Sequence, residues 1–193
     1  MSSAREHYKT LLQKVEDLAR KQKATYGEEI RCRVGCFDCC RPPASLFAVE
    51  VAPLQEAVKA LSPSQKESLK ERLLSFQREE RELCPLLEDG GCSVYEGRPV
   101  ICRTQGYALW FREPPPEAQP QEELPEGGGW MNWCAYNFHE TKPRKEDAFD
   151  VQRLNVMLSL ISSLHWPAEL TRQSLTELLD EALHDTSSGE THS

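Results

Sequence analysis

The sequence lacks the long apolar runs of a membrane protein, because no stretch approaches the roughly 18 apolar residues that a spanning helix needs. The first ten residues, MSSAREHYKT, also lack the apolar segment and the small-residue cleavage site of a secretory signal. These two absences favour a soluble, cytoplasmic protein without a membrane partner. Cytoplasmic thiols are kept reduced, so a disulfide framework is not expected.

Basic residues are too few for a nucleic-acid-binding protein. The 23 lysines and arginines are outnumbered by 31 aspartates and glutamates, which leaves a net charge of −8 and a pI of about 5.2. A protein that binds the phosphate backbone needs a basic face, and the sequence contains no such cluster. We therefore expect no nucleic-acid partner, and the acidic surface is more simply a solubility feature.

Cysteine, by contrast, is abundant. Four of the eight cysteines fall within nine residues and four more follow singly: Cys32, Cys36, Cys39 and Cys40, then Cys84, Cys92, Cys102 and Cys134. Thiols at this density oxidise and cross-link unless they are paired in disulfides or bound to a soft metal. A reducing compartment and a chain long enough to bury a core without covalent bridges favour metal. A redox-active dithiol and inert buried thiols are the alternatives.

The spacing of the cysteines suits metal ligands, and we expect all eight to serve as such. Two sulfurs two or three residues apart can reach one ion, as in the pair Cys32 and Cys36 or the pair Cys36 and Cys39. The adjacent Cys39 and Cys40 would point to opposite sides of an extended chain, so both are not expected at one small ion. Eight thiolates match two four-coordinate zinc sites, a [4Fe–4S] cluster with four other thiols, or a cluster with one zinc. Sulfur ligands do not distinguish zinc from iron.

The spacing of apolar residues predicts a mainly α protein, folded as a single domain over residues 1–193. An amphipathic N-terminal helix is expected over residues 4–27, ending at a glycine. A second helix is expected over residues 45–61, interrupted or restarted near Pro53.

The later helices carry clearer boundary signals. Ser62 is an expected N-cap, followed by Pro63 at the first helical position. Residues 147–184 are predicted to form the C-terminal core helices, and the apolar set of 147–164 is too broad for a surface helix. The polar tail over residues 185–193 is expected to be disordered.

Between these helices, residues 32–134 form the predicted cysteine-cluster region, with irregular metal-binding loops and one short β-hairpin. The turn Asp89-Gly90-Gly91 would join the two strands of the hairpin, with Cys84 and Cys92 near its ends. Residues 113–129 hold most of the prolines and a run of glycines, which is typical of an irregular surface loop.

Side chains near the cysteines allow two interpretations each. Aromatic residues around Cys134 would shield a metal site from water or belong to an ordinary core. They are Trp130, Trp133, Tyr136 and Phe138. Arg98 and Arg103 would offset the negative charge of thiolates, or form surface ion pairs with Glu96 or Glu88.

The cysteine-rich segment resembles a known family. The resemblance is carried by Cys36-x-x-Cys39-Cys40, Cys84-Pro85-Leu86-Leu87, Gly91-Cys92-Ser93-Val94-Tyr95 and Arg98-Pro99-x-x-Cys102-Arg103. This pattern is similar to that of the CxxCxxCC family, the YkgJ-type cysteine-cluster proteins, which are described as zinc- or iron-chelating. The resemblance implies chelation by Cys36, Cys39, Cys40, Cys84, Cys92 and Cys102, with Cys134 as a further ligand. Cys32 departs from the usual spacing, because three residues instead of two separate it from Cys36.

The leading functional hypothesis is a metal-binding protein that holds an iron–sulfur cluster or zinc, with a metal ion or cluster as its partner and any protein partner unidentified. The alternatives are a metalloenzyme, such as an iron–sulfur oxidoreductase or a protein lysine methyltransferase-like enzyme, and a metal-trafficking or redox-sensing protein. Neither a glycine-rich dinucleotide motif nor the roughly 250 residues of a typical βα barrel is present. The sequence therefore leaves open whether the protein is an enzyme.

Overall fold

The computed structural model describes residues 2–33, 35–41, 44–114, 121–125, 128–166 and 172–184. The chain packs as two compact units. Unit 1 comprises Met1–Arg33 and Val100–His165, and unit 2 comprises Val34–Pro99 and Trp166–Ser193. Helices dominate both units and the sheets are small, which confirms the mainly α prediction. The single domain stays a prediction, and the tail 185–193 lies outside the described residues.

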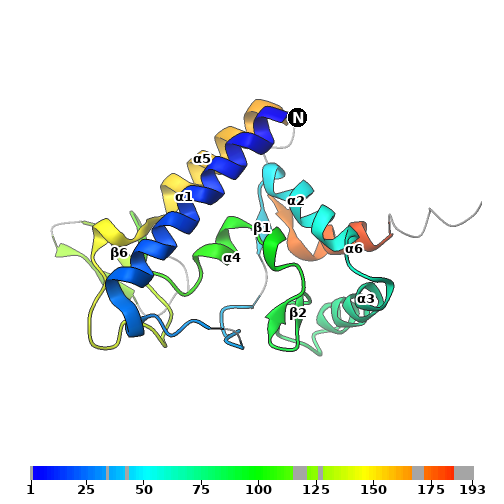
Figure 1. The fold of residues 1–193 in the computed structure, drawn as a ribbon, viewed down its shortest axis with the longest axis horizontal. Helices are drawn as coiled ribbons and strands as arrows, with labels where there is room; N and C mark the ends of the chain where they lie inside the picture. Colours follow the sequence, from blue (N-terminus) through cyan, green and yellow to red (C-terminus); the bar gives the residue numbers. More distant parts are fainter. Residues whose placement is uncertain are drawn as a thin grey trace, which may run out of the picture. The chain divides into compact units, whose positions relative to one another are not determined.

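Unit 1 is built on two helices that pack against each other, α1 (Ser2–Tyr26) and α5 (Val151–His165) (Figure 1). Helix α1 buries one stripe at helical spacing, as its sequence pattern predicts. The stripe consists of Ala4, Tyr8, Leu11 and Val15. The helix ends at Gly27, whose positive φ of 50° starts the short 3-10 turn η1 (Gly27–Glu29). The amphipathic N-terminal helix is thus confirmed.

Helix α5 is less buried than its sequence suggests. It begins only at Val151, because the preceding pair Phe149–Asp150 forms strand β7. Three of its apolar side chains are exposed to between 56% and 68%: Val156, Leu160 and Leu164. Helix α5 therefore buries one face only, whereas the sequence favoured a helix buried all round.

A four-stranded sheet, which the sequence did not predict, completes unit 1. Its strands are β4 (Leu109–Phe111), β5 (Gln121–Glu123), β6 (Trp130–Asn132) and β7, in the order β5-β6-β4-β7. Strand β6 pairs antiparallel with β4 and β5, and β7 pairs parallel with β4. Strand β5 lies inside the segment 113–129 that was expected to be irregular. Strands of two or three residues carry too few side chains for a period of two to be recognised.

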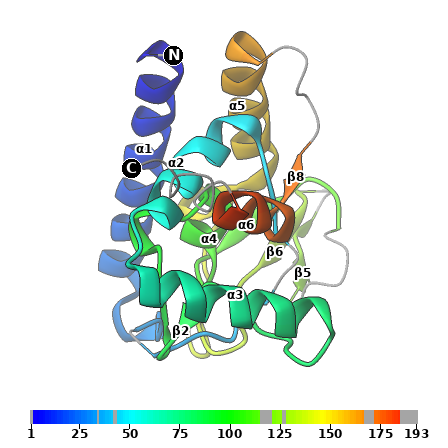
Figure 2. The same ribbon diagram turned by 90° about the vertical axis from the view of Figure 1, so that its right-hand side faces the viewer.

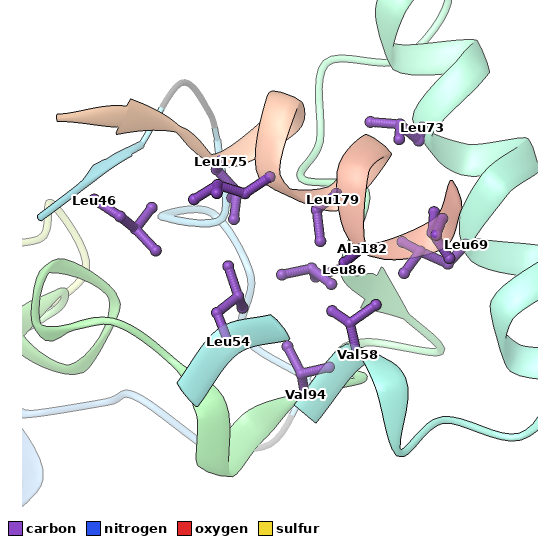
Figure 3. Packing of buried hydrophobic residues seen from close by; sticks show 12 residues of the cluster. Leu46, Leu54, Val58, Leu69, Leu73, Leu86, Val94, Leu175, Leu179 and Ala182 are labelled. Atoms are coloured by element: carbon purple, nitrogen blue, oxygen red, sulfur yellow. The ribbon is translucent and has the colours of Figure 1, made fainter. Parts of the chain in front are cut away.

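Unit 2 is a three-helix layer around its own core. Helix α6 (Leu175–His184) packs against both α2 (Ala48–Lys59) and α3 (Pro63–Gln77) (Figure 2). Leucines from all three helices meet in one cluster, shown in Figure 3. A short antiparallel pair, β1 (Ser45–Leu46) and β8 (Gln173–Ser174), ties the start of α2 to the start of α6.

The ends of these helices follow local sequence signals, with one exception. The Ser62 hydroxyl accepts a hydrogen bond from the Gln65 N–H at 3.2 Å, which confirms the predicted N-cap. Helix α2, however, continues through Pro53 without the predicted interruption. Side chains on both sides of the proline, Val51 and Leu54, pack into the same core cluster, and this burial offsets the missing hydrogen bond.

None of the helices in the described ranges is long and apolar enough to cross a membrane.

Candidate metal centre

The eight cysteines are divided between the two units. Unit 1 contains Cys32, Cys102 and Cys134, and unit 2 contains Cys36, Cys39, Cys40, Cys84 and Cys92. No disulfide joins any of them, and all except the exposed Cys39 are half-buried. Each unit therefore has to be considered as a separate set of sulfur donors.

In unit 2 the segment with Cys36, Cys39 and Cys40 lies against the β-hairpin that follows α3. The N–H of Cys84 donates a hydrogen bond to the carbonyl oxygen of Cys40 at 2.9 Å. The backbone of Gly35, next to Cys36, also lies close to Gly90 in the hairpin turn: a Cβ on Gly90 would be 3.5 Å from the Cα of Gly35. Cysteine segments more than forty residues apart in sequence thus meet, as a shared metal site requires.

The vicinal cysteines adopt a turn instead of the extended chain assumed from the sequence. The N–H of Cys40 donates to the carbonyl of Phe37 at 2.8 Å and closes this turn. The two thiols then lie on the same side, where the hydrogen bond with Cys40 raises the pKa of Cys39. The expectation that the two side chains point to opposite sides assumed an extended chain and was wrong, because the segment is a turn in which the two thiols hydrogen-bond.

The predicted hairpin is confirmed and presents two half-buried sulfurs. Strands β2 (Leu87–Glu88) and β3 (Gly91–Cys92) pair antiparallel, and the turn between them places Asp89 and Gly90 at positive φ. Each cysteine is followed two residues later by a core side chain, Leu86 after Cys84 and Val94 after Cys92. Leu86 and Val94 are about 4% exposed and lie in the core cluster drawn in Figure 3, and Cys84 and Cys92 pack against that cluster.

Backbone N–H groups near these two sulfurs affect their pKa values. Burial raises the pKa of the Cys84 thiol, whereas the N–H groups of Leu86 and Leu87 and the charge of Arg81 act to lower it. The N–H of Leu87 donates to the carbonyl oxygen of Cys84 at 3.0 Å. Burial likewise raises the pKa of Cys92, against the N–H of Val94 and the nearby charge of Arg98. Burial outweighs these amide donors and the charges of Arg81 and Arg98, so both thiols are poor thiolates, and a bound metal ion would supply further positive charge. This donor set fits a soft metal centre.

In unit 1, Cys32 has a polar neighbour that sequence reasoning missed. The side-chain amide of Asn137 donates a hydrogen bond to the Cys32 sulfur at 3.3 Å. The N–H of Asn137 donates to the carbonyl of Cys134 at 2.9 Å, so this turn also carries the second cysteine of the unit. Cys102 lies on the short helix α4 (Val100–Thr104), which packs against α1.

The sulfurs of the described residues are not arranged around one position that a metal ion could occupy. Within the described ranges, no three side chains of His, Cys, Asp or Glu are arranged so that they could hold a metal ion. The backbone thus brings cysteine segments together within each unit, while the eight-ligand assignment stays a prediction.

Comparison with known proteins identifies the cysteine segment. A family model described as "CxxCxxCC: Putative zinc- or iron-chelating domain" matches residues 31–128, just over half of the chain. The chain belongs to the CxxCxxCC family. No curated protein and no solved structure gives a significant match.

The aromatic residues of this CxxCxxCC protein that follow the matched segment mostly belong to the core of unit 1. Trp133 and Phe138 are buried. The rings of Trp133 and Tyr26 both contact Phe138 edge-to-face, with centroid distances of 6.2 Å from Trp133 and 5.2 Å from Tyr26. Tyr136 is exposed. Of the two interpretations, Trp133 and Phe138 fit the ordinary core.

The two arginines of the CxxCxxCC signature have different neighbours. Arg103 forms an ion pair with Glu16 at 2.8 Å, a partner that the sequence did not suggest. Arg98 lies over the ring of Tyr95, 3.5 Å from its centroid, and its charge lowers the pKa of Cys92. Arg98 thus offsets thiolate charge in the way that the sequence suggested.

Arg81, a further arginine that sequence reasoning missed, holds the loop of Cys84. Its guanidinium donates to the carbonyl oxygens of Leu83 (3.0 Å), Cys84 (3.3 Å) and Leu87 (2.9 Å). Arg72 on α3 donates to the carbonyl of Pro85 in the same loop at 2.7 Å. These bonds, with the one from the Leu87 N–H to the Cys84 carbonyl at 3.0 Å, fix the backbone of the loop that carries the Cys84 sulfur. No sequence signal marked Arg81, because it falls in a Glu/Arg-rich run that is typical of a solvated helix face.

We therefore expect Arg81→Met to weaken metal binding roughly tenfold, the usual effect of losing a group that orients a ligand. Competition with a chelating dye measures this affinity. Arg78→Met is the matched control, because Arg78 is exposed at the end of α3 and donates no side-chain bond to the Cys84 loop. Equal affinities of the two variants would contradict this role of Arg81.

Proposed function

We propose that this protein binds zinc or an iron–sulfur cluster through its cysteine thiolates. The observation that carries the proposal is the meeting of two cysteine segments in unit 2, where the N–H of Cys84 donates to the carbonyl oxygen of Cys40 at 2.9 Å. Backbone N–H groups near the sulfurs of Cys84 and Cys92 act to lower the pKa of both thiols, and such donors tune metal–sulfur centres. Membership of a zinc- or iron-chelating family supports the same function.

The ligands that we propose are the eight cysteines. The five cysteines of unit 2 exceed the four that a tetrahedral centre needs, and Cys40 and Cys84 lie on backbones that are already hydrogen-bonded. A metal ion would draw these sulfurs together, since rotation about the Cα–Cβ bond moves a thiol without moving the chain. In unit 1 we propose Cys32, Cys102 and Cys134.

A reducing compartment such as the cytoplasm fits this function. Thiolates remain available to a soft metal only where disulfide formation is suppressed. Sulfur donors select zinc, copper(I) and iron–sulfur centres over hard ions such as magnesium.

Anaerobic purification followed by metal analysis tests the proposal. A brown protein with iron and acid-labile sulfide in about equal amounts would establish a cluster, whereas a colourless protein with stoichiometric zinc would establish a zinc site. Oxygen-protected protein that contains neither zinc nor iron would overturn the proposal.

A further inference from the structure

Asn137 is a buried polar side chain that lies outside the family-matched segment and has no place in the sequence motif. Its side chain is only 2% exposed. We infer that Asn137 is a positioning residue, whose amide holds the thiolate of Cys32 in the orientation of a metal ligand. This inference rests on the proposed function, and it adds a residue that would orient one of the proposed metal ligands of unit 1.

The hydrogen bonds of Asn137 fix the direction of its amide group. Its Oδ1 accepts from the backbone N–H of Arg31 at 2.8 Å, so the oxygen must face that donor. The Nδ2 group therefore faces the other way, where it donates to the carbonyl of Gly106 and to the sulfur of Cys32 at 3.3 Å. A flipped amide would place two donors against each other and would leave the sulfur beside an oxygen.

Gly106 lies on the other side of the Cys32 sulfur and leaves the space that the sulfur occupies. Its φ is +88°, and a Cβ at this position would lie 2.4 Å from the sulfur of Cys32, well inside van der Waals contact. Only a residue without a side chain leaves space for the sulfur there. Three segments distant in sequence, at residues 31–32, 106 and 137, thus shape one site for the sulfur of Cys32.

If the Asn137 amide only joined the backbones of Arg31 and Gly106, a hydrogen bond to the Cys32 sulfur would not be required. An N–H donor directed at sulfur favours the thiolate over the thiol, and it limits how much negative charge the sulfur passes to a bound metal. Cys32 is also the cysteine whose spacing departs from the usual family pattern. Its orientation is therefore supplied by Asn137 and Gly106 instead of by a short ligand loop.

The test uses the full-length protein, purified anaerobically with its own metal, and compares Asn137→Ala with Asn132→Ala. Asn132 is the matched control: it is also buried in unit 1, and within the described residues its Nδ2 has no hydrogen-bond partner. Alkylation of Cys32 by iodoacetamide is followed by peptide mass spectrometry. Loss of a group that orients a metal ligand typically weakens metal binding 10- to 100-fold. Because a sulfur released from metal is open to the reagent, we expect about tenfold faster alkylation of Cys32 in Asn137→Ala, although the lost N–H donor alone would slow it. We expect no change at Cys84 in unit 2, and no change at either site in Asn132→Ala.

A double-mutant cycle separates this role from simple structural support. If Asn137 acts through Cys32, the variant with both Cys32→Ala and Asn137→Ala should bind metal as tightly as Cys32→Ala alone. Additive losses would overturn the inference, as would unchanged alkylation in Asn137→Ala.

Gly106→Ala provides a second route if Asn137→Ala does not fold, because it displaces the sulfur while Asn137 is kept. It should expose Cys32 selectively, and equal alkylation of Cys32 in Gly106→Ala and wild type would overturn the inference. Wild-type protein without metal would instead refute the proposed function itself.

Discussion

Replacing Cys84 by serine is expected to weaken metal binding roughly a hundredfold. Four thiolates together contribute about 10 to 16 kcal/mol to a structural zinc site, so one contributes about 3 kcal/mol, and each 1.4 kcal/mol is a factor of ten in affinity. The loss should be large at this position because the backbone of Cys84 is bonded to the segment of Cys40 and the side chain packs against the core of unit 2. The serine oxygen is a harder donor and keeps its proton near neutral pH.

Metal affinity of the purified variant, measured by chelator competition, checks this prediction. Ser93→Ala is a suitable control, because it removes a side-chain hydrogen bond to the carbonyl of Leu86 in the same hairpin but leaves every sulfur in place. The backbone N–H of Ser93 still donates to that carbonyl at 2.8 Å. A Cys84→Ser variant with the affinity of Ser93→Ala would show that Cys84 is no ligand.

Removing the metal should also loosen the contact between the two cysteine segments of unit 2. In the described residues around it, the contact includes the hydrogen bond between Cys84 and Cys40 and the approach of Gly35 to Gly90. These are backbone contacts at half-exposed positions, whereas Leu86 and Val94 are anchored in the core. The hairpin is therefore the pre-formed half of the site, and the turn around Cys39 is the half that metal binding would order.

Features set by neighbouring residues could be predicted from the sequence. Ser62 and Pro63 start a helix through the hydrogen bonds of one turn, and an aspartate followed by two glycines closes a hairpin by its own backbone preferences. The spacing of the cysteines likewise indicated soft-metal chemistry, because ligand spacing in a loop is a local property.

Features that depend on distant segments could not be predicted. The sheet of unit 1 pairs β4 with β7, and forty residues separate these strands in the sequence. The roles of Arg81 and Asn137 arise in the same way, since each acts through backbone groups that the fold brings to it. For the candidate site, the sequence thus identified the sulfurs but not the groups that orient them.

The last prediction concerns Asp147, a buried carboxylate in the short 3-10 turn η4 (Lys145–Asp147) of unit 1. Lys21 and Arg144 form ion pairs with it at 2.9 and 2.7 Å, and the hydroxyl of Tyr26 donates to it at 2.9 Å. Burial opposes ionisation of Asp147, but these three donors outweigh burial and lower its pKa to about 2. The carboxylate thereby joins α1 to the segment that leads into α5.

Asp147→Asn is expected to cost about 2 to 3 kcal/mol. This is less than the roughly 3 to 5 kcal/mol of a fully buried ion pair, because Lys21 and Arg144 are more than half exposed. For a chain of this length, that loss corresponds to a decrease in Tm of about 5 to 10 °C. Glu146→Gln is the matched control, since Glu146 lies in the same turn and its 3.4 Å ion pair with Arg144 is exposed.

The pH dependence distinguishes this mechanism from a loss of packing. Because folding lowers the pKa of Asp147, the carboxylate stabilises the folded state fully above its ordinary value near 4, and this stabilisation is lost as the pH falls towards 2. The difference in unfolding free energy between wild type and Asp147→Asn should therefore be largest near neutral pH and shrink in acid. Urea unfolding monitored by circular dichroism at pH 7, 4 and 3 measures it. A difference that stays constant over this range would mean that the ionised carboxylate contributes nothing, and that Asp147 acts through its shape alone.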